Sequence, residues 1–495
     1  MNRRDAHGPA HHIAAAAVAA WLAAGCAAST PPAQAPVTAQ RPATPLDRSV
    51  APAPGPAPVL DLPPIQRFTL SNGLEVLLVE QHELPVVDID VLVRTGAGAD
   101  TGRVAGRATL AADLLDEGTE TRSALEIAEA IDFLGAGLET RASWDATSAS
   151  LHVLRPRLEP ALEILADVVI HPAFPEQEVR RKKEERLTAL LQQQDEPRIL
   201  ANNAFAEVLY GTEHPYGRPI LGTPESIRAL DRDALVAFYG TYFRPGNAAI
   251  VVVGDVTRDE IHSLLERHFG AWQPAPVPAA EPPAPPAPGP TAITIVHKPG
   301  AAQSEIRVGQ IGVARDTPDY FPLLVMNTVL GGSFSSRLNI RLREERAYTY
   351  GAGSSFDERR APGPFVASTA GFTGVTDSAV VELLREIRRI REEPVPADEL
   401  ARAKNYIALG LPRSFETTGD IADHIGEVVV YGLGDEYYDD YIERVQAVSA
   451  ADVQRVAQRH LDPERMAIVI AGDRAEIEAK LEALGIGPVQ VRELK

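Results

Sequence analysis

Cysteine and basic residues are both scarce in this sequence. Its 495 residues include a single cysteine, Cys26, so no disulfide can form within the chain. Lys and Arg number 48 against 68 Asp and Glu, which gives a formal net charge of -20. Because phosphate binding draws on clustered Lys and Arg, and no basic patch is evident, this balance argues against a nucleic-acid partner.

Long hydrophobic runs are also missing, except near the start. Residues 1–26 combine Arg3 and Arg4, an apolar run over 13–25 and then Cys26, which predicts a lipoprotein-type signal peptide that is too short to span a bilayer. The segment "LAAGC" resembles a bacterial lipobox, whose cysteine becomes lipidated. We expect a periplasm-facing lipoprotein of the bacterial envelope, at the outer membrane, with a soluble folded part and the lipid anchor as its membrane contact. A soluble periplasmic protein is the alternative.

Two Pro-rich runs divide the chain. Residues 27–64 are rich in Pro, Ala and Thr, cannot bury a core and predict an extended tether. A second Pro/Ala-rich run at 273–291 predicts a linker between two halves, 65–272 and 292–495. A chain of this length is too long to fold around a single hydrophobic core, so two domains are expected.

The two halves contain a repeat. Residues 175–211 and 396–432 have equal length, and each run begins with Pro and ends with Tyr-Gly. Several positions coincide: Glu178 with Glu399, Arg181 with Arg402, Lys183 with Lys404, and Tyr210 with Tyr431. Further on, "AIVVVGD" in the first half matches "AIVIAGD" in the second. Two homologous domains follow from this duplication.

Apolar periodicity alternates between two and 3.6 residues within each half. Asn72-Gly73 between alternating strands predicts a hairpin, and Ile127, Ile131 and Leu134 share one helical face that Gly135 would end. Strands occur in pairs as well as between helices. We therefore predict an α+β fold in which each domain is a largely antiparallel sheet with helices packed on one face.

Over residues 65–490 the chain resembles the pitrilysin/insulinase family of zinc peptidases, which includes the processing peptidases. In the first half the likeness lies in "LSNGLEVLLVE", "LGAGLETRASWDAT", "DEPRILANNAFAEVLYGTEHPYGRPILGTPESI" and "YFRPGNAAIVVVGDV". In the second half it lies in "VLGGSFSSRLNIRLREERAYTYGAGSSF". The resemblance implies a metalloendopeptidase architecture in both halves.

The zinc ligands of that family are absent here. The family uses His-x-x-Glu-His on a helix and a later Glu, since two imidazoles on one helical face grip zinc and the Glu takes a proton from the metal-bound water. The resemblance puts these positions on Thr109, Ala112, Asp113 and Ala189. No His-x-x-Glu-His occurs in any register, and a lone carboxylate makes no zinc site. We expect no metal and no other cofactor in this chain.

Two other groups are weaker metal candidates. His214 in "GTEHPYGRP" could ligate a metal, but the same phrase recurs in family members with full ligand sets, so a structural loop role is expected. Asp113, Asp116 and Glu117 could bind a hard cation, although a solvated helix end is the expected interpretation. At the family's substrate edge, Glu139 and Thr140 replace the usual Asn and Ala.

A second set of family residues is present. Arg343 and Tyr350 match the Arg and Tyr that the family's non-zinc domain offers to the substrate backbone and the tetrahedral oxyanion. Tyr348 lies two residues earlier and is the competing tyrosine; register favours Tyr350. The glycine loop over 331–338 suits approach to a substrate, and close helix packing explains its glycines equally well.

A first half without zinc ligands, combined with a second half that keeps Arg and Tyr, resembles the non-catalytic subunits of heterodimers in this family. The leading hypothesis is a pseudo-peptidase subunit that supplies Arg343 and Tyr350 to a zinc-bearing partner of the same family, which cleaves peptides or unfolded protein segments. One alternative is a structural or peptide-binding envelope lipoprotein without a role in proteolysis. Another is a metallopeptidase active by itself, which would need a ligand set that the sequence does not show.

Overall fold

The Asn72-Gly73 turn forms the hairpin that the sequence predicts. In the computed structural model, which describes residues 55, 60, 62–102 and 104–493, Gly73 adopts a φ of +87° that suits a residue without a side chain. The flanking strands β1 (Gln66–Thr69) and β2 (Glu75–Glu80) pair antiparallel. The signal peptide, Cys26 and most of the predicted tether lie outside the described residues.

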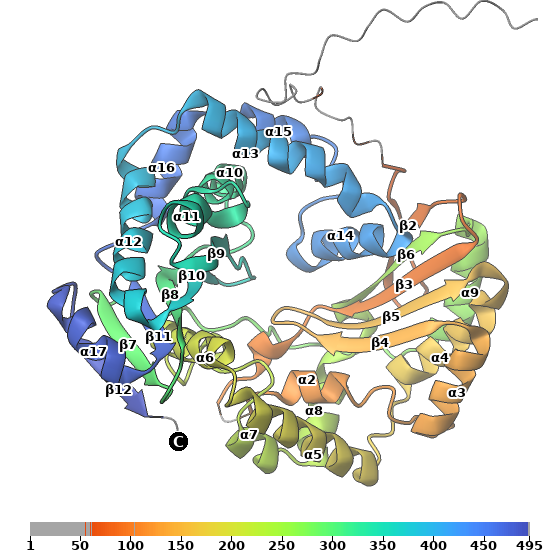
Figure 1. Cartoon of the computed structure of the whole chain (residues 1–495). Helices are drawn as coiled ribbons and strands as arrows, with labels where there is room; N and C mark the ends of the chain where they lie inside the picture. Colours follow the sequence, from red (N-terminus) through yellow and green to blue (C-terminus); the bar gives the residue numbers. More distant parts are fainter. Residues whose placement is uncertain (1–54, 56–59, 61, 103, 494–495) are drawn as a thin grey trace, which may run out of the picture. The chain divides into compact units, whose positions relative to one another are not determined.

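The first half of the folded chain forms one six-stranded sheet (Figure 1). Its order is β1-β2-β6-β3-β5-β4, and every neighbouring pair is antiparallel except β2 with β6. The other strands are β3 (Val86–Val93), β4 (Gly137–Ala142), β5 (Thr147–Leu154) and β6 (Ala248–Gly254). The helices are α2 (Arg107–Ala112), α3 (Ala124–Leu134), α4 (Leu158–Ile170), α5 (Glu176–Gln193), α6 (Pro197–Tyr210), α7 (Pro224–Ala229), α8 (Arg232–Tyr242) and α9 (Arg258–Phe269).

The second half repeats five strands of this sheet in the same order and differs in the sixth, an outer strand. Its order is β12-β7-β11-β8-β10-β9, with parallel pairing from β12 through β7 to β11 and antiparallel pairing onward to β9. The strands are β7 (Ala292–His297), β8 (Gln303–Ile311), β9 (Thr349–Phe356), β10 (Pro364–Phe372), β11 (Ala467–Gly472) and β12 (Val489–Glu493). The helices are α10 (Tyr320–Asn327), α11 (Arg337–Asn339), α12 (Thr376–Glu392), α13 (Ala397–Gly410), α14 (Thr418–Tyr431), α15 (Tyr441–Ala447), α16 (Ala450–His460) and α17 (Arg474–Ala483), with π-helical turns η5 (Thr328–Gly332) and η6 (Ile340–Glu345).

The predicted α+β class is confirmed, and local signals explain many element ends. Helix α3 begins at a capping box of Ser123 with Glu126 and ends at Gly135, which takes the left-handed conformation. Its buried residues Ile127 and Ile131 join the core beneath the first sheet. The described residues form no helix that is long and apolar enough to cross a membrane.

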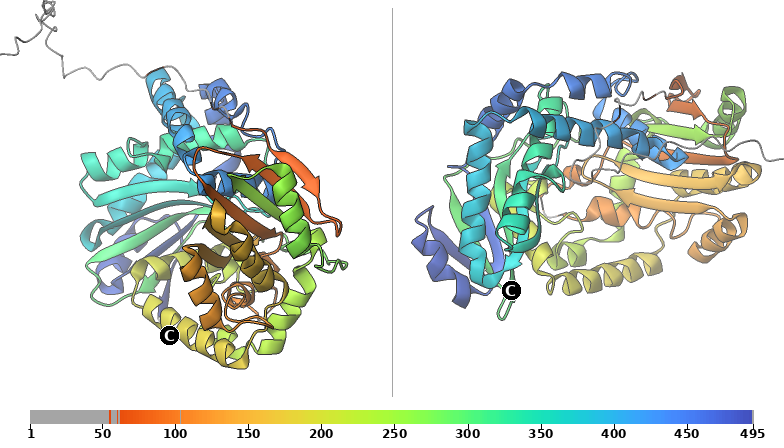
Figure 2. Two further views of the ribbon diagram at one scale, coloured as in Figure 1. Left: turned by 90° about the vertical axis from the view of Figure 1, so that its right-hand side faces the viewer. Right: turned by 45° about the horizontal axis from the view of Figure 1, so that its top comes forward.

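Two helices are exchanged between the halves. Helix α6 of the first half packs on β8 and β11 of the second sheet, where Phe205 and Ala201 share a buried cluster with Val469. Helix α14 of the second half packs on β3 and β6 of the first sheet, with Ile425 in the same buried cluster as Val251. Figures 1 and 2 show both helices beside the sheet of the opposite half. Each sheet is therefore covered by its own helices on one face and receives one borrowed helix on the other.

The tyrosines at the ends of the exchanged helices fasten the two halves. Tyr210 at the end of α6 donates a hydrogen bond to the carbonyl of Pro362 (3.0 Å), in the turn between β9 and β10. Tyr431 at the end of α14 donates to Asp145 Oδ2 (3.1 Å), in the turn between β4 and β5. The two tyrosines that coincide in the sequence repeat therefore each donate a hydrogen bond to a turn of the opposite half.

The Pro-rich run between the halves, without helix or strand, lies against the folded chain. His214 Nε2 lies 2.9 Å from the carbonyl of Pro283, and Arg465 donates to the carbonyl of Pro288 (2.7 Å). Ala280 packs against the core of the first half. The predicted boundaries of the two domains and their linker stay a prediction.

Candidate functional site

Helix α2 and its C-cap residue hold three of the four positions where the family's zinc ligands and catalytic Glu would stand. It begins after Gly106, which has a φ of +85°, and Ala112 is fully buried. Thr109 is also buried, and its hydroxyl lies 3.2 Å from the carbonyl of Ile220. Asp113 ends the helix and remains 37% exposed. The fourth position, Ala189, is on α5.

Arg186 of α5 connects the two positions that would carry histidines. Its guanidinium donates to Thr109 Oγ1 (3.0 Å), forms an ion pair with Asp113 and donates to the carbonyl of Leu221 (3.1 Å). Arg186 is only 8% exposed and lies three residues before Ala189, on the same face of α5. A cationic side chain therefore bridges the degenerate motif. Sequence reasoning missed it; an Arg one turn before the expected Glu ligand was the available signal.

These residues do not fit zinc. A metal held from positions 109, 113 and 189 would lie between α2 and α5, where the Arg186 guanidinium already bridges two of the three. Its positive charge repels a second cation, and hydroxyl and methyl groups supply no adequate donor set. Within the part of the chain that the structure describes, no group of three or more His, Cys, Asp or Glu side chains is placed to hold a metal ion.

The acidic residues after α2 are not the solvated helix end that the sequence suggests. Glu117 forms ion pairs with Lys182 (2.6 Å) and with Arg181, both on α5. Burial raises the pKa of Glu117, but the hydrogen bonds from Lys182 and Arg181 outweigh it, so the pKa lies below its usual value. Burial, together with the neighbouring Glu117 charge, raises the pKa of Asp116. Charged side chains of α5 thus hold the end of α2 in place.

His214 has the structural role that its loop position predicts. Its Nδ1 accepts a hydrogen bond from the backbone N–H of Tyr216 (3.0 Å), so its Nε2 carries the proton and donates to Pro283. Burial lowers the pKa of His214, which keeps the ring neutral. With both ring nitrogens engaged, His214 has none left for a metal.

Tyr350 and Arg343 form the exposed part of the second-half motif. Tyr350 is on β9, the edge strand of the second sheet, and is 81% exposed. Tyr348 precedes this strand and packs against the core instead. Arg343 lies on the π-helical turn η6, half-exposed, 3.3 Å from Glu344 and with its guanidinium 4.6 Å from the ring centre of Phe334. Of the two tyrosines, Tyr350 is the one with a largely exposed side chain.

Asn339 joins the segments that carry this motif. Its Nδ2 donates to the carbonyl of Phe334 (2.7 Å), and its Oδ1 accepts from the N–H of Ala352 on β9 (3.3 Å). Gly331 of the preceding glycine loop packs so closely that an added Cβ would lie 2.2 Å from the backbone nitrogen of Ser354. Close packing therefore accounts for this glycine, one of the two explanations that the sequence leaves open.

The first sheet offers a polar surface beside its edge strand β4. Exposed Glu139 lies on β4, and two adjoining cavities of about 460 and 540 Å³ share Asp90, Arg141 and Asp423 in their walls. Burial raises the pKa of Asp90 to about 6. Sequence reasoning missed Asp90, although an Asp at alternate positions of the apolar stretch "VVDIDVLV" was a signal.

Two family descriptions match this chain. Residues 75–224 match the insulinase family, peptidase family M16, and residues 229–407 match the peptidase M16 inactive domain. The chain is 27% identical over 413 residues to an uncharacterized zinc protease of Mycobacterium leprae, covering 82% of this chain and 91% of that one. It is also 27% identical over 399 residues to an uncharacterized zinc protease of Bacillus subtilis, covering 80% of this chain and 95% of that one.

Solved structures show the same fold. A peptidase M16 inactive domain from Pseudomonas fluorescens is 30% identical, with a TM-score of 0.78 over 83% of this chain and 98% of that one. A protease from Helicobacter pylori is 21% identical and has a TM-score of 0.78 over 83% of this chain and all of that one. The chain therefore belongs to the insulinase family of peptidases, family M16, as its sequence motifs in both halves indicate.

Proposed function

We propose that this chain is a non-catalytic subunit of a family M16 metalloendopeptidase, supplying Arg343 and Tyr350 to a composite active site whose zinc is held by a partner of the same family. The observation that carries the proposal is an asymmetry between the halves. In the first half a buried guanidinium bridges the degenerate zinc motif. In the second half Tyr350 and Arg343 are open to a ligand.

The chemistry of the two side chains suits this role. A guanidinium presents several N–H donors in a plane and can grip the main-chain carbonyl of a peptide. A phenol can donate a hydrogen bond to an oxyanion as negative charge develops on it. Neither group activates water by itself, so we expect the chain alone to be inert on peptides or unfolded protein.

The same proposal includes an envelope location. The lipoprotein-type signal peptide and Cys26 support a chain that is anchored by lipid at the outer membrane and faces the periplasm. An affinity pull-down from the native envelope checks partner and location together. It should recover a zinc-bearing relative in equal amount, and recovery of none would argue for the structural or peptide-binding alternative.

The decisive experiment mixes the purified chain with a zinc-bearing family member and follows cleavage of an unfolded protein. We expect Tyr350→Phe to lower the rate of the mixture by about 100-fold, as is typical when an oxyanion donor is removed. Arg343→Ala should also lower it, because the peptide carbonyl then loses its charged donor. Tyr406→Phe is the matched control, because this tyrosine on α13 is also largely exposed. A mixture that cleaves no faster than the zinc-bearing member alone, with Arg343→Ala without effect, would overturn the proposal.

An independent metallopeptidase is the least supported alternative. It needs a donor set at the first-half motif, and Arg186 stands between the positions that would provide it. Metal analysis of the purified chain tests it directly. One tightly held zinc per chain that is lost with Asp113→Ala would establish this alternative and exclude the proposed subunit role.

A further inference from the structure

Phe334 exposes an aromatic ring beside Arg343. Its side chain is 68% exposed, although a phenylalanine ordinarily gains by leaving water. One face of the ring is near the Arg343 guanidinium, 4.6 Å from the ring centre, which is the distance of a cation–π contact. Glu344, 3.3 Å from Arg343, partly balances the positive charge. The ring is thus oriented by a charged neighbour and remains largely open to a ligand.

The segment that presents Phe334 is held at both sides. Its carbonyl accepts the hydrogen bond from buried Asn339, and the N–H of Ser336 donates to the carbonyl of Ser333 (3.1 Å). Ser333 Oγ in turn donates to the carbonyl of Thr328 (3.2 Å) at the end of the preceding helix. These bonds fix the backbone on either side of Phe334, so the ring projects from an ordered turn.

The same asparagine ties this turn to the strand that carries Tyr350. Asn339 Oδ1 accepts from Ala352 on β9, two residues after Tyr350. The N–H of Tyr348 donates to the carbonyl of Leu342 (2.9 Å), which closes the turn between η6 and β9. Phe334, Arg343 and Tyr350 therefore project from three segments that the hydrogen bonds of Asn339 and of this turn join together.

We propose that Phe334 is a specificity-determining residue of the composite site, where its open ring receives an aromatic or aliphatic side chain of the bound peptide. This inference rests on the proposed function, in which Arg343 and Tyr350 hold the peptide backbone. Apolar contact removes both surfaces from water and adds to the backbone interactions. A Lys or Arg side chain is disfavoured at this position, because the Arg343 charge repels it.

The test measures binding of two peptides to the full chain by fluorescence anisotropy. The probes are two fluorescein-labelled, unstructured peptides of equal length that differ at one central residue, Leu in one and Ser in the other. We expect wild type to bind the Leu peptide about fivefold more tightly, and Phe334→Ala to bind both peptides with the affinity of the Ser peptide. Phe334→Leu should keep most of the preference.

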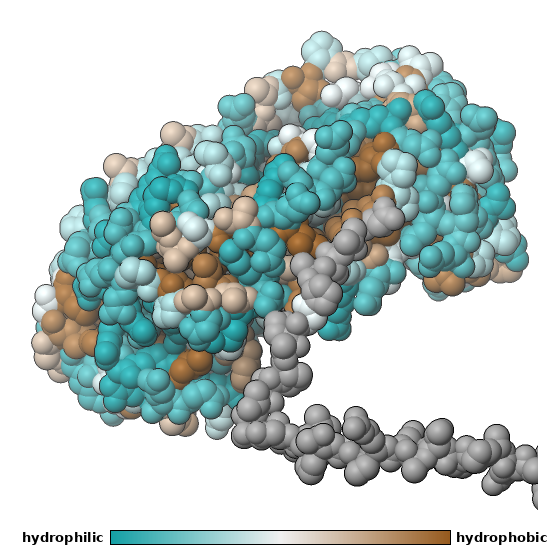
Figure 3. All heavy atoms as spheres, turned by 90° about the horizontal axis from the view of Figure 1, so that it is seen from above, coloured by the Kyte–Doolittle hydropathy of each residue, from teal (hydrophilic) through white to brown (hydrophobic). Residues whose placement is uncertain are grey.

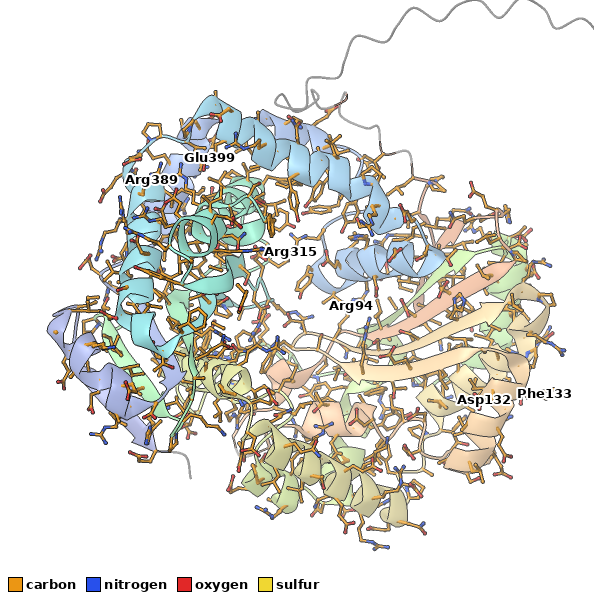
Figure 4. The ribbon with its side chains drawn as sticks, in the orientation of Figure 1. Arg94, Asp132, Phe133, Arg315, Arg389 and Glu399 are labelled. Carbon is orange, nitrogen blue, oxygen red and sulfur yellow. The ribbon has the colours of Figure 1, made fainter. Side chains whose placement is uncertain are left out.

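The controls separate specificity from folding and from the proposed function. Phe133 on α3, which Figure 4 labels, is 80% exposed. Phe133→Ala should leave both affinities unchanged. The role of Phe334 would be overturned if Phe334→Ala weakened the binding of both peptides equally, or if wild type showed no preference between them. In either case the proposed function would stand as long as Arg343→Ala weakens the binding of both peptides. If wild type binds neither peptide, or if Arg343→Ala and Tyr350→Phe leave both affinities unchanged, the proposed function fails and this inference fails with it.

Discussion

The guanidinium of Arg186 lies 3.0 Å from the hydroxyl oxygen of Thr109, so a side chain of α5 contacts the position where the family's first histidine would stand. The same guanidinium pairs with Asp113, at the position of the second histidine. One buried cation therefore connects the degenerate zinc motif, α5 and the carbonyl of Leu221.

Restoring the ligands alone should not restore zinc binding. We expect a variant with Thr109→His, Ala112→Glu, Asp113→His and Ala189→Glu to bind zinc at least about 100-fold more weakly than the same variant that also carries Arg186→Ala, because the guanidinium repels a cation between α2 and α5. Calorimetric titration with zinc and metal analysis after dialysis measure this. Equal zinc affinity with and without Arg186 would contradict the argument.

The two tyrosines of the second-half motif should differ in their effect on stability. Tyr348 packs against the core, so Tyr348→Ala should lower the free energy of unfolding by about 2 kcal/mol. Tyr350 is almost fully exposed, and Tyr350→Ala should change it by less than about 0.5 kcal/mol. Urea unfolding of both variants checks the pair; equal destabilisation would show that Tyr350 has a structural role.

Asp145 should be important for the connection between the halves. Its buried carboxylate accepts from the Tyr431 hydroxyl (3.1 Å) and from the backbone N–H of Arg360 (3.0 Å), both in the second half. Asp145→Ala leaves these donors without their acceptor and should cost about 3 kcal/mol, whereas Tyr431→Phe removes one hydroxyl and should cost about 1 kcal/mol. Thermal unfolding measures both, and a neutral Asp145→Ala would mean that this carboxylate does not help to join the halves.

Glu358 should make stability depend on pH. Burial raises the pKa of this carboxyl from 4.5 to about 7, and the charges of Asp357 and Glu427 add to the effect while Arg315, which Figure 4 labels, opposes it. The folded state then binds more protons than the unfolded state between these values. The contribution of Glu358 is therefore fully present below about pH 4.5 and is lost as the pH rises through about 7, by up to about 3 kcal/mol.

The comparison that isolates this effect is Glu358→Gln. This variant should lose less stability than wild type between pH 5 and pH 8 in urea unfolding, because the amide does not titrate. Glu83→Gln, at an exposed position, is the control and should follow wild type. If wild type and Glu358→Gln show the same dependence of stability on pH, Glu358 does not cause that dependence.

Sequence alone does not identify the exposed ring of Phe334 as part of a binding site. On the face drawn in Figure 3, hydrophilic side chains predominate and hydrophobic ones occur in scattered patches. Phe334 is an exposed aromatic residue, and its proposed role depends on its contact with Arg343. Arg343 lies nine positions later in the chain and on another element. Residue type and spacing could not predict that contact, since it depends on how the turn before α11 packs.

The sequence by itself determined the α+β class, the duplicated halves and the absence of the zinc motif. These features are local: hairpins, caps and apolar periodicity follow from neighbouring residues, and a missing ligand can be read directly. Tertiary structure alone decided that α6 and α14 each cover the sheet of the opposite half, and that Arg186 bridges Thr109 and Asp113. An amphipathic helix does not specify which apolar surface it will cover, and a charged side chain does not specify its partner. Only the packing of segments far apart in the chain settles both.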